Sequence, residues 1–548
     1  MAAAALAYLI AVPPGTSSAS TTVEYSVVAA DGVSDSAARA AIERAGGSVV
    51  GEIKAVGMYR VTTEEDDFAA KVAGSKGLVG ASARKPIGHG RPAERTELVE
   101  GSAPAERRGR VRAAHAKQAG PADLDPLDEQ LYGLKMVRAD KARTVEAGDH
   151  QVTVGVLDTG LDGSHPDLAP NFDTKLSRNF APDMADIDGP CEAADCVDPI
   201  GTDDNGHGTH IAGTIGAAVN GVGVSGVAPE VSLVEVKVGQ DANLFFLDPV
   251  VNGITYAADA GIDVINMSFY VDPWLFNCTA NPADSPAAQA EQRTVITAMT
   301  RALAYAHQHG VTMIAAMGNE GLDLGAPKVD KKSPDYGGAP YTRTIDNDTC
   351  LSLPQEAPDV LGVTSVGPSG IKAAYSNYGV ERVALAAPGG YPQDTVGPAA
   401  DRAILSAFPK SVIKAKGRLD ADGNLTADGA KYYVQDCTKD GVCGFYARMQ
   451  GTSMAAPHVA GVAALIASRY GRDDAAHGGK KMDPDAVKER LFSTAAQHDC
   501  PNPPLQSYQD VGYPAANDAL CTGDKKFNGF YGHGIVDAYA AVADQPKS

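Results

Sequence analysis

From about residue 150 onward, short apolar runs alternate with longer stretches of helical character. The apolar runs are continuous, which is typical of strands buried on both faces of a parallel sheet. Strands separated by helices predict an α/β fold with a mostly parallel central sheet between two helical layers, and chemistry at the carboxyl ends of its strands. Strands are predicted at 152–157, 231–238, 264–267, 311–316, 360–366 and 383–385, and helices at 211–218, 250–260 and 293–308.

Residues 22–83 form a pattern of their own. Strand-like runs lie at 23–29 and 78–83, and two more lie within 48–62. Helices are predicted at 35–45, where Ser34 is the expected cap, and at 64–73, which is acidic in its first turn. The order β-α-β-β-α-β predicts a small ferredoxin-like α+β domain.

The segments on either side of this domain have a different composition. Residues 1–20 contain an apolar core too short to span a bilayer, followed by Pro13-Pro14-Gly15 and small residues, which indicates a signal peptide or, alternatively, an Ala-rich tail. Nothing later predicts a stable membrane anchor. Residues 84–125 are rich in Arg, Pro and Gly without periodicity and predict a basic exposed linker. Its run at 107–110 favours a protease-sensitive tether over a nuclear or heparin-type patch.

Charge and cysteine content narrow the class of protein. The net charge is −21, which excludes affinity for nucleic acid through phosphate neutralisation. The eight cysteines lack the paired C-x-x-C spacing of a zinc site, so four local disulfides in an oxidising compartment are predicted, and with them a secreted, extracellular protein. Sequence neighbours suggest Cys191–Cys196, Cys278–Cys350, Cys437–Cys443 and Cys500–Cys521, although eight cysteines allow 105 connectivities.

Two polar residues, Asp158 and His207, lie at the ends of predicted elements early in the α/β region. Asp158 ends the first strand in VLDTG, where it either faces the ligand edge of the sheet or caps a turn. Asp-Thr-Gly also surrounds the catalytic aspartates of pepsin-like proteases, but a single chain of that class needs two such motifs, and no second Asp-Thr-Gly or Asp-Ser-Gly occurs. His207 opens a helix in GHGTH. His207 and His210 are spaced like metal ligands, but the Glu of H-E-x-x-H is missing, so the alternatives are an active-site base and an ordinary helix start.

Two further candidates lie later in the chain. Ser453 occurs in GTSMAAPHVAG at the first turn of a long small-residue helix, where its backbone N–H has no helical partner. The alternative is an ordinary helix cap. Asn319 follows a strand in AAMGNEG, where its amide can donate into a cleft or serve a turn.

Together, VLDTG, GHGTH and GTSMAAPHVAG resemble the subtilisin-like serine proteases, from Asp128 to about Val542. The resemblance implies the subtilisin-like three-layer fold for residues 126–548, with extra material near 272–292, 325–350 and 391–447. It makes residues 22–83 the propeptide, an intramolecular chaperone and inhibitor. It assigns Ser453 as nucleophile, His207 as general base and then acid, Asp158 as the group that orients His207, and Asn319 with the Ser453 N–H as the oxyanion hole.

The resemblance also implies a substrate-binding strand. Many relatives have Ser-Leu-Gly-Gly beside the specificity pocket, whereas this chain has Ser268-Phe269-Tyr270-Val271, in which Tyr270 replaces a glycine whose backbone normally lies against substrate. We expect substrate contacts from Ser268, Phe269, Tyr270 and Gly318, and a specificity that differs from the broad one of subtilisin.

A structural calcium ion is expected in the loop after the His207 helix. No organic cofactor is expected. The resemblance implies oxygen ligands from Asp128, Asp167, Ala218, Asn220, Val222 and Val224, a set that suits Ca²⁺, although a glycine-rich loop can also close without metal.

The function predicted from the sequence is that of a secreted serine endopeptidase made as a zymogen, with protein or peptide substrates and its own propeptide as inhibitor. The alternative is a catalytically inactive binding protein of the same fold. An esterase is disfavoured because the G-x-S-x-G elbow is missing.

Overall fold

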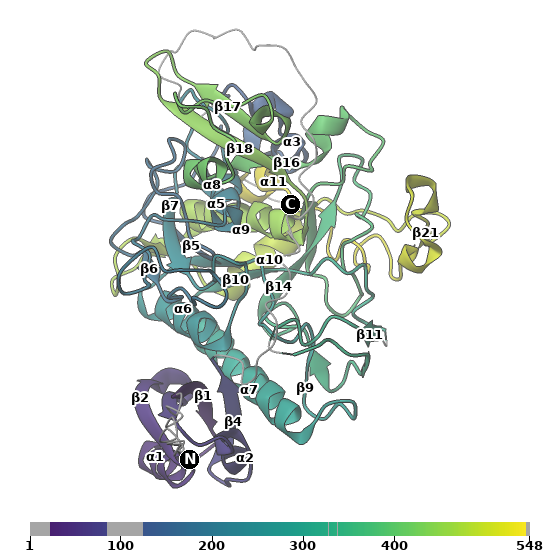
Figure 1. Ribbon diagram of the computed structural model, residues 1–548. Helices are drawn as coiled ribbons and strands as arrows, with labels where there is room; N and C mark the ends of the chain where they lie inside the picture. Colours follow the sequence, from purple (N-terminus) through teal and green to yellow (C-terminus); the bar gives the residue numbers. More distant parts are fainter. Residues whose placement is uncertain (1–21, 85–123, 327, 337, 544–548) are drawn as a thin grey trace, which may run out of the picture.

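The computed structural model describes residues 22–84, 124–326, 328–336 and 338–543 (Figure 1). The predicted signal peptide and nearly all of the basic linker lie outside these residues. The small N-terminal domain, in purple, lies at one end of the larger α/β domain and beside the long helix α7 (Pro286–Gln308).

The centre of the α/β domain is a seven-stranded sheet in the order β15-β14-β10-β8-β5-β7-β6. All six strand pairs are parallel, which confirms the predicted sheet. The strands are β5 (Thr153–Asp158), β6 (Arg178–Asn179), β7 (Ser232–Lys237), β8 (Val264–Met267), β10 (Thr312–Ala316), β14 (Val360–Val366) and β15 (Leu385–Pro388).

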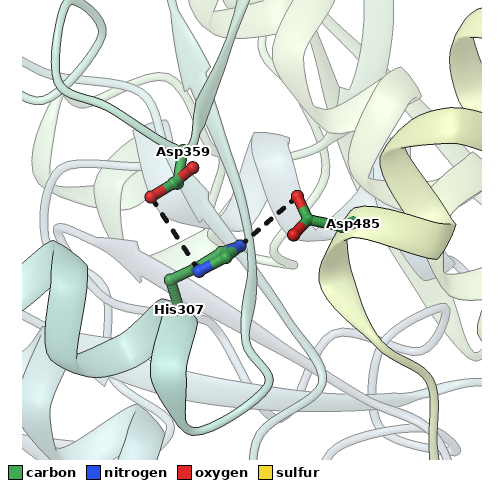
Figure 2. Close-up of side chains that lie close together, drawn as sticks. All are labelled: His307, Asp359 and Asp485. Carbon is green, nitrogen blue, oxygen red and sulfur yellow. Dashed lines mark ion pairs between the residues drawn. The ribbon is translucent and has the colours of Figure 1, made fainter.

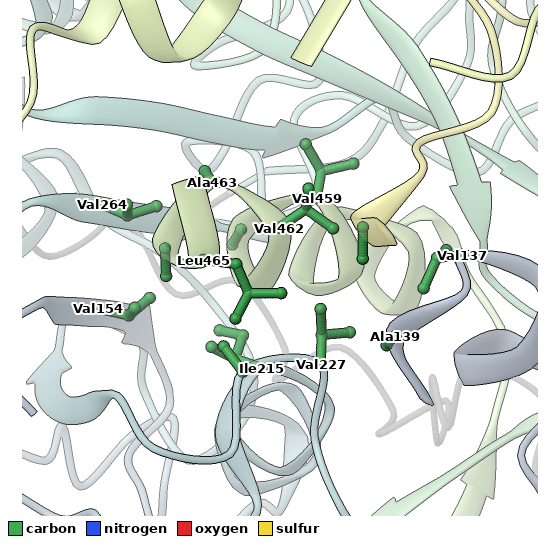
Figure 3. Close-up of a cluster of buried hydrophobic side chains, with 14 of the residues drawn as sticks. Val137, Ala139, Val154, Ile215, Val227, Val264, Val459, Val462, Ala463 and Leu465 are labelled. Carbon is green, nitrogen blue, oxygen red and sulfur yellow. The ribbon is translucent and has the colours of Figure 1, made fainter. Parts of the chain in front are cut away.

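Helices cover the sheet on both faces because its side chains alternate between two cores. Val154 and Val156 of β5 pack into a core with α5 (His207–Gly216) and α9 (Thr452–Tyr470). Leu157 packs on the opposite face with α6 (Leu247–Asp259) and α7. Figure 3 shows the first core, where Val459, Val462, Ala463 and Leu465 of α9 lie among Val154, Val264 and Ile215.

The N-terminal domain has the predicted element order and an antiparallel sheet in the order β2-β3-β1-β4. Ser34 caps α1 as expected, accepting a hydrogen bond from the Ala37 N–H. The second helix is four residues shorter than predicted because residues 64–67 form a turn whose start is held by Thr63 Oγ1. Its elements are β1 (Val23–Ala29), α1 (Asp35–Arg44), β2 (Gly47–Ile53), η1 (Lys54–Val56), β3 (Met58–Thr63), α2 (Phe68–Ala73) and β4 (Leu78–Ala83).

The three stretches predicted as extra material contain short elements, and the helix predicted from residue 293 starts earlier than expected. Helix α7 begins at Pro286 rather than residue 293, since Ser285 caps it and proline is well suited to a first helical position. The remaining α-helices and strands are α3 (Tyr132–Met136), α4 (Ala139–Ala142), β9 (Asn277–Cys278), β11 (Lys328–Asp330), β12 (Arg343–Ile345), β13 (Cys350–Leu351), β16 (Ile404–Ala407), α8 (Lys410–Ala415), β17 (Tyr433–Cys437), β18 (Cys443–Met449), β19 (Arg472–Asp473), β20 (Lys480–Lys481), α10 (Pro484–Thr494), β21 (Leu505–Gln506), β22 (Ala519–Leu520) and α11 (Ala538–Val542).

The four predicted disulfides are all present. Within the ranges described, none of the helices combines the length and apolarity that a membrane crossing requires.

Candidate active site

The candidate catalytic residues stand where strands and helices begin or end, at one edge of the central sheet. Asp158 is the last residue of β5, His207 the first of α5, Ser453 the second of α9, and Asn319 follows β10. Parallel strands bring their carboxyl ends to the same edge, so residues that are far apart in sequence meet there.

Asp158 and His207 form a buried pair. The Nδ1 atom of His207 lies 2.8 Å from Oδ1 of Asp158, and the two side chains are almost fully buried. The same Asp158 oxygen accepts the Thr159 N–H at 2.8 Å. A carboxylate at Nδ1 holds a proton on that nitrogen and leaves Nε2 as the basic atom of the imidazole.

The start of α5 is fixed by Asp203, a residue that the sequence analysis did not select. Its two carboxylate oxygens accept hydrogen bonds from the N–H groups of Asn205, Gly206 and Thr209 and from the hydroxyls of Thr159 and Thr209. Asp203 therefore ties the turn that carries His207 to the strand end that carries Asp158. Because Asp203 lies three residues before the N-cap residue Gly206, the usual N-cap pattern did not reveal it.

Ser453 lies in the first turn of α9 against the end of β8. Its hydroxyl lies 3.3 Å from the Ser268 carbonyl oxygen, and the Ser268 hydroxyl donates to the Ser453 carbonyl at 3.2 Å. Ser453 is only 4% exposed. The predicted nucleophile and the predicted substrate-binding strand are thus in direct contact.

The amide of Asn319 is held by Thr452, the neighbour of Ser453. Oδ1 of Asn319 accepts the Thr452 N–H at 2.9 Å and the Thr452 hydroxyl at 3.0 Å. With Oδ1 engaged, the amide NH₂ is directed to the other side of the group. Thr452 was missed as a functional residue, although it is part of the GTS motif.

The other predicted substrate residues have different surroundings. The ring of Phe269 stacks on Phe245 inside the core, so only its backbone can face a ligand. The hydroxyl of Tyr270 donates to Asp335, and burial raises the pKa of Tyr270 well above its usual value. Gly318 has φ of 96°, and a Cβ there would come within 2.5 Å of the Asn377 side chain, so this turn requires glycine.

His210 does not join His207 in a metal site. Its Nε2 atom lies 3.0 Å from the Ile404 carbonyl oxygen, and burial lowers its pKa to about 3. His210 is therefore a neutral residue that packs α5 against β16.

A histidine between two aspartates lies at the opposite edge of the sheet, away from the candidate catalytic residues. Figure 2 shows His307, at the end of α7, between Asp359 and Asp485, with one ring nitrogen toward each carboxylate at 3.9 and 3.6 Å. Because the carboxylates face different nitrogens, the geometry is that of an ion-pair bridge between α7, the turn before β14 and α10, and not of one metal centre.

Two further acidic groups share Asp241, one with Asp183 and Glu192 and the other with Asp198 and Asp204. The buried ammonium of Lys237 lies 2.6 Å from Asp241 and 3.2 Å from Asp198, so a cation of the chain already neutralises part of their charge.

The predicted calcium loop brings most of its residues together. Asp167 Oδ1 lies 3.3 Å from Nδ2 of Asn220, and Asp167 Oδ2 accepts the Val224 N–H at 3.1 Å; Ala218 and Val222 belong to the same loop. Asp128, in contrast, is bound by Ser225 and faces the buried guanidinium of Arg143 at 3.5 Å. Asp125 occupies the loop instead and accepts the Gly221 N–H at 2.7 Å.

Comparisons with known proteins identify the family of the chain. Residues 149–534, which include all four candidate catalytic residues, match the family model of the peptidase S8 or subtilase family. Subtilisin DY of Bacillus licheniformis is 28% identical over 368 residues, 66% of this chain and 90% of that protein. The major intracellular serine protease of Bacillus subtilis (strain 168) is 30% identical over 347 residues, 63% of this chain and 76% of that protein.

A solved structure supports the fold over nearly the whole chain. The crystal structure of the epidermin leader peptide processing serine protease from Staphylococcus aureus aligns with a TM-score of 0.60 at 21% identity, covering 96% of this chain and 100% of that chain. The sequence matches and the shared fold lead to one assignment: the chain belongs to the subtilase family of serine peptidases.

Proposed function

We propose that this protein is a secreted serine endopeptidase, made as a zymogen, that cleaves protein or peptide substrates through a Ser453–His207–Asp158 triad. The observation that carries the proposal is the buried 2.8 Å contact between His207 Nδ1 and Asp158, at the same sheet edge as Ser453. A serine hydroxyl is a poor nucleophile until a correctly oriented base takes its proton.

In the proposed reaction, Nε2 of His207 takes the Ser453 proton as Oγ attacks the scissile carbonyl carbon. The tetrahedral intermediate collapses to an acyl-enzyme when His207 returns the proton to the leaving amine, and water then repeats the sequence in reverse. The Asp158 carboxylate stabilises the imidazolium. The developing oxyanion is bound by the Asn319 amide and the Ser453 N–H.

The N-terminal domain is proposed to act as an inhibitor until it is cut away between about residues 107 and 127, largely outside the described residues. Contacts between this domain and α7 support the proposal: Arg301 donates to the carbonyl oxygens of Ala29 and Val56 at 3.0 and 2.9 Å. The four disulfides support a secreted protein, because they persist in oxidising compartments.

Replacing the nucleophile tests the proposal. Ser453→Ala is expected to abolish peptide hydrolysis and labelling by a fluorophosphonate probe, with an unchanged circular dichroism spectrum. Ser468→Ala is the matched control, since Ser468 lies in the same helix, is buried, and donates only within it, to Ala464. Absence of labelling in the wild-type protein would favour the alternative, an inactive binding protein of this fold, and residual hydrolysis by Ser453→Ala would remove the assignment.

We also propose a structural calcium ion at the loop of residues 218–224. Asp125, Asp128 and Asp167 are buried there with one buried cation, Arg143. Burial raises the pKa of Asp125 to about 7 and that of Asp167 well above its usual value. Excess buried carboxylate suits a hard cation, and since Arg143 neutralises Asp128, we propose Asp125 in its place beside Asp167 and Asn220.

A further inference from the structure

We propose that Asn377 is a positioning residue for catalysis, which fixes the turn that carries Asn319. The inference rests on the proposed function, because it assumes that Asn319 binds the oxyanion. Asn377 lies in the loop after β14 and is 1% exposed. Within that loop it follows Ser376, whose hydroxyl accepts the Ser365 N–H of β14 at 3.0 Å.

The side chain of Asn377 uses its full hydrogen-bonding capacity on one short segment, residues 317–322. Its Oδ1 accepts the N–H groups of Glu320 and Leu322 at 3.1 and 2.8 Å. Its Nδ2 donates to the Met317 carbonyl at 3.0 Å and to the Glu320 carboxylate at 2.9 Å. A planar amide with two donors and two acceptor positions therefore holds both sides of the turn at once.

Backbone hydrogen bonds connect the same two segments. The Asn377 N–H donates to the Gly318 carbonyl at 3.0 Å, and the Gly321 N–H donates to the Tyr375 carbonyl at 2.6 Å. The Gly318 backbone approaches so closely that an added Cβ would lie 2.5 Å from Asn377 Nδ2. The turn of residues 317–322 is therefore packed directly against the Asn377 side chain.

Asn319 has two independent supports as a result. Thr452 orients its amide plane, whereas Asn377 fixes the backbone from which that amide extends. An oxyanion donor works only within a few tenths of an ångström of its productive position, so loss of the second support should weaken the transition state while leaving substrate binding largely intact. A loss of kcat without a loss of substrate binding differs from the effect of a purely structural residue, whose replacement would lower stability alone.

A double-mutant cycle tests this coupling. Asn377→Ala is expected to lower kcat about tenfold with KM within about twofold of wild type, and to weaken a peptide aldehyde, whose adduct places an oxyanion in the same hole, by a similar factor. In an Asn319→Ala background, Asn377→Ala should change kcat less than about twofold. Asn377→Asp keeps the shape and Oδ1 but replaces both donated bonds by repulsion from the Met317 carbonyl and the Glu320 carboxylate, and it gives a second version of the cycle if the alanine variant does not fold.

Asn528 provides the matched control. It is also a fully buried asparagine, and its side chain makes four hydrogen bonds, to backbone groups of His498, Asp524, Phe530 and Tyr531, and none to residues 317–322. Asn528→Ala should lower the melting temperature without changing kcat of the folded enzyme.

The outcomes separate this inference from the proposed function. An equal loss of kcat by Asn377→Ala in both backgrounds, or an unchanged kcat in folded Asn377→Ala and Asn377→Asp, would overturn the positioning role alone. An unchanged kcat in Asn319→Ala would remove the oxyanion assignment, and the positioning role with it.

Discussion

Asn319 is the residue whose chemistry depends most on its orientation, because only the nitrogen side of its amide can stabilise an oxyanion. Thr452 engages Oδ1 through two hydrogen bonds and so sets that orientation. Asn319→Ala is expected to lower kcat by roughly 10²–10³ with little change in KM, a range that comes from the corresponding donor of subtilisin itself. Steady-state kinetics on a peptide substrate measure it, and a change confined to KM would instead make Asn319 a substrate-binding residue.

The candidate catalytic residues could be predicted from sequence, whereas their supports could not. Local pattern places Asp158, His207, Asn319 and Ser453 at boundaries between regular elements and turns, and the resemblance to the subtilisin-like proteases implies their roles. Thr452 and Asn377 act through hydrogen bonds to residues more than 50 positions away. Such contacts depend on how the loops meet at the sheet edge, which no local pattern encodes.

Helix α7 contacts the N-terminal domain through Arg301, while α6 adds an ion pair between Asp248 and Arg60 at 3.0 Å. Besides its two bonds to backbone carbonyls, Arg301 pairs with Asp31 at 2.5 Å. Hydrogen bonds from a charged donor are worth about 1.5–3 kcal/mol each. Arg301→Ala in the mature enzyme should therefore raise the inhibition constant of a 22–84 fragment by at least about 10-fold without changing peptide hydrolysis.

Arg293→Ala is the control for this measurement. Arg293 lies on the same helix and donates to the Thr279 carbonyl, within the α/β domain. Equal inhibition of the wild-type, Arg293→Ala and Arg301→Ala enzymes would show that α7 is not the docking site for the inhibitor.

The loop of residues 218–224 carries the calcium prediction. An ion that binds only the folded state adds RT ln(1 + [L]/Kd) to stability, about 2.7 kcal/mol at 100 times Kd. EDTA should therefore lower the melting temperature of the wild-type protein, and Asp167→Asn should largely remove that effect. An unchanged melting temperature in excess EDTA, with no metal by elemental analysis, would show that the loop closes without an ion.

Among the secondary-structure elements, regular strands are easier to predict from sequence than short or irregular ones. The strands of the buried sheet were located to within a few residues because continuous apolar runs mark them. β6 was missed because two residues, Arg178 and Asn179, carry no pattern. The small sheet of β16, β18 and β17 was recognised only as extra material, since its pairing is set by tertiary contacts.

Long-range hydrogen bonds link the first and last parts of the α/β domain. Arg138, near the start of the α/β domain, donates to Asp537, near its end, at 2.9 Å. The C-terminal segment also reaches the loop of residues 371–378, where the Tyr508 hydroxyl donates to the Lys372 carbonyl at 2.9 Å. A buried lysine therefore lies at the junction between the catalytic sheet and the last part of the chain.

Lys372 should make global stability depend on pH. Its ammonium is buried among Tyr378, Tyr508 and Phe530, bonds only to the carbonyls of Ala373 and Ser376, and burial lowers its pKa from 10.5 to about 7. Below about pH 7 both the folded and unfolded chains hold the proton, and the full burial penalty applies. Between about pH 7 and 10.5 the unfolded chain binds more protons, so this residue stabilises the fold as pH rises, by at most about 1.4 kcal/mol per pH unit. Lys372→Met removes this contribution, so the stability of wild type relative to the variant in urea unfolding should increase from pH 7 to 10, and a difference that does not vary with pH would show that Lys372 is not the titrating group.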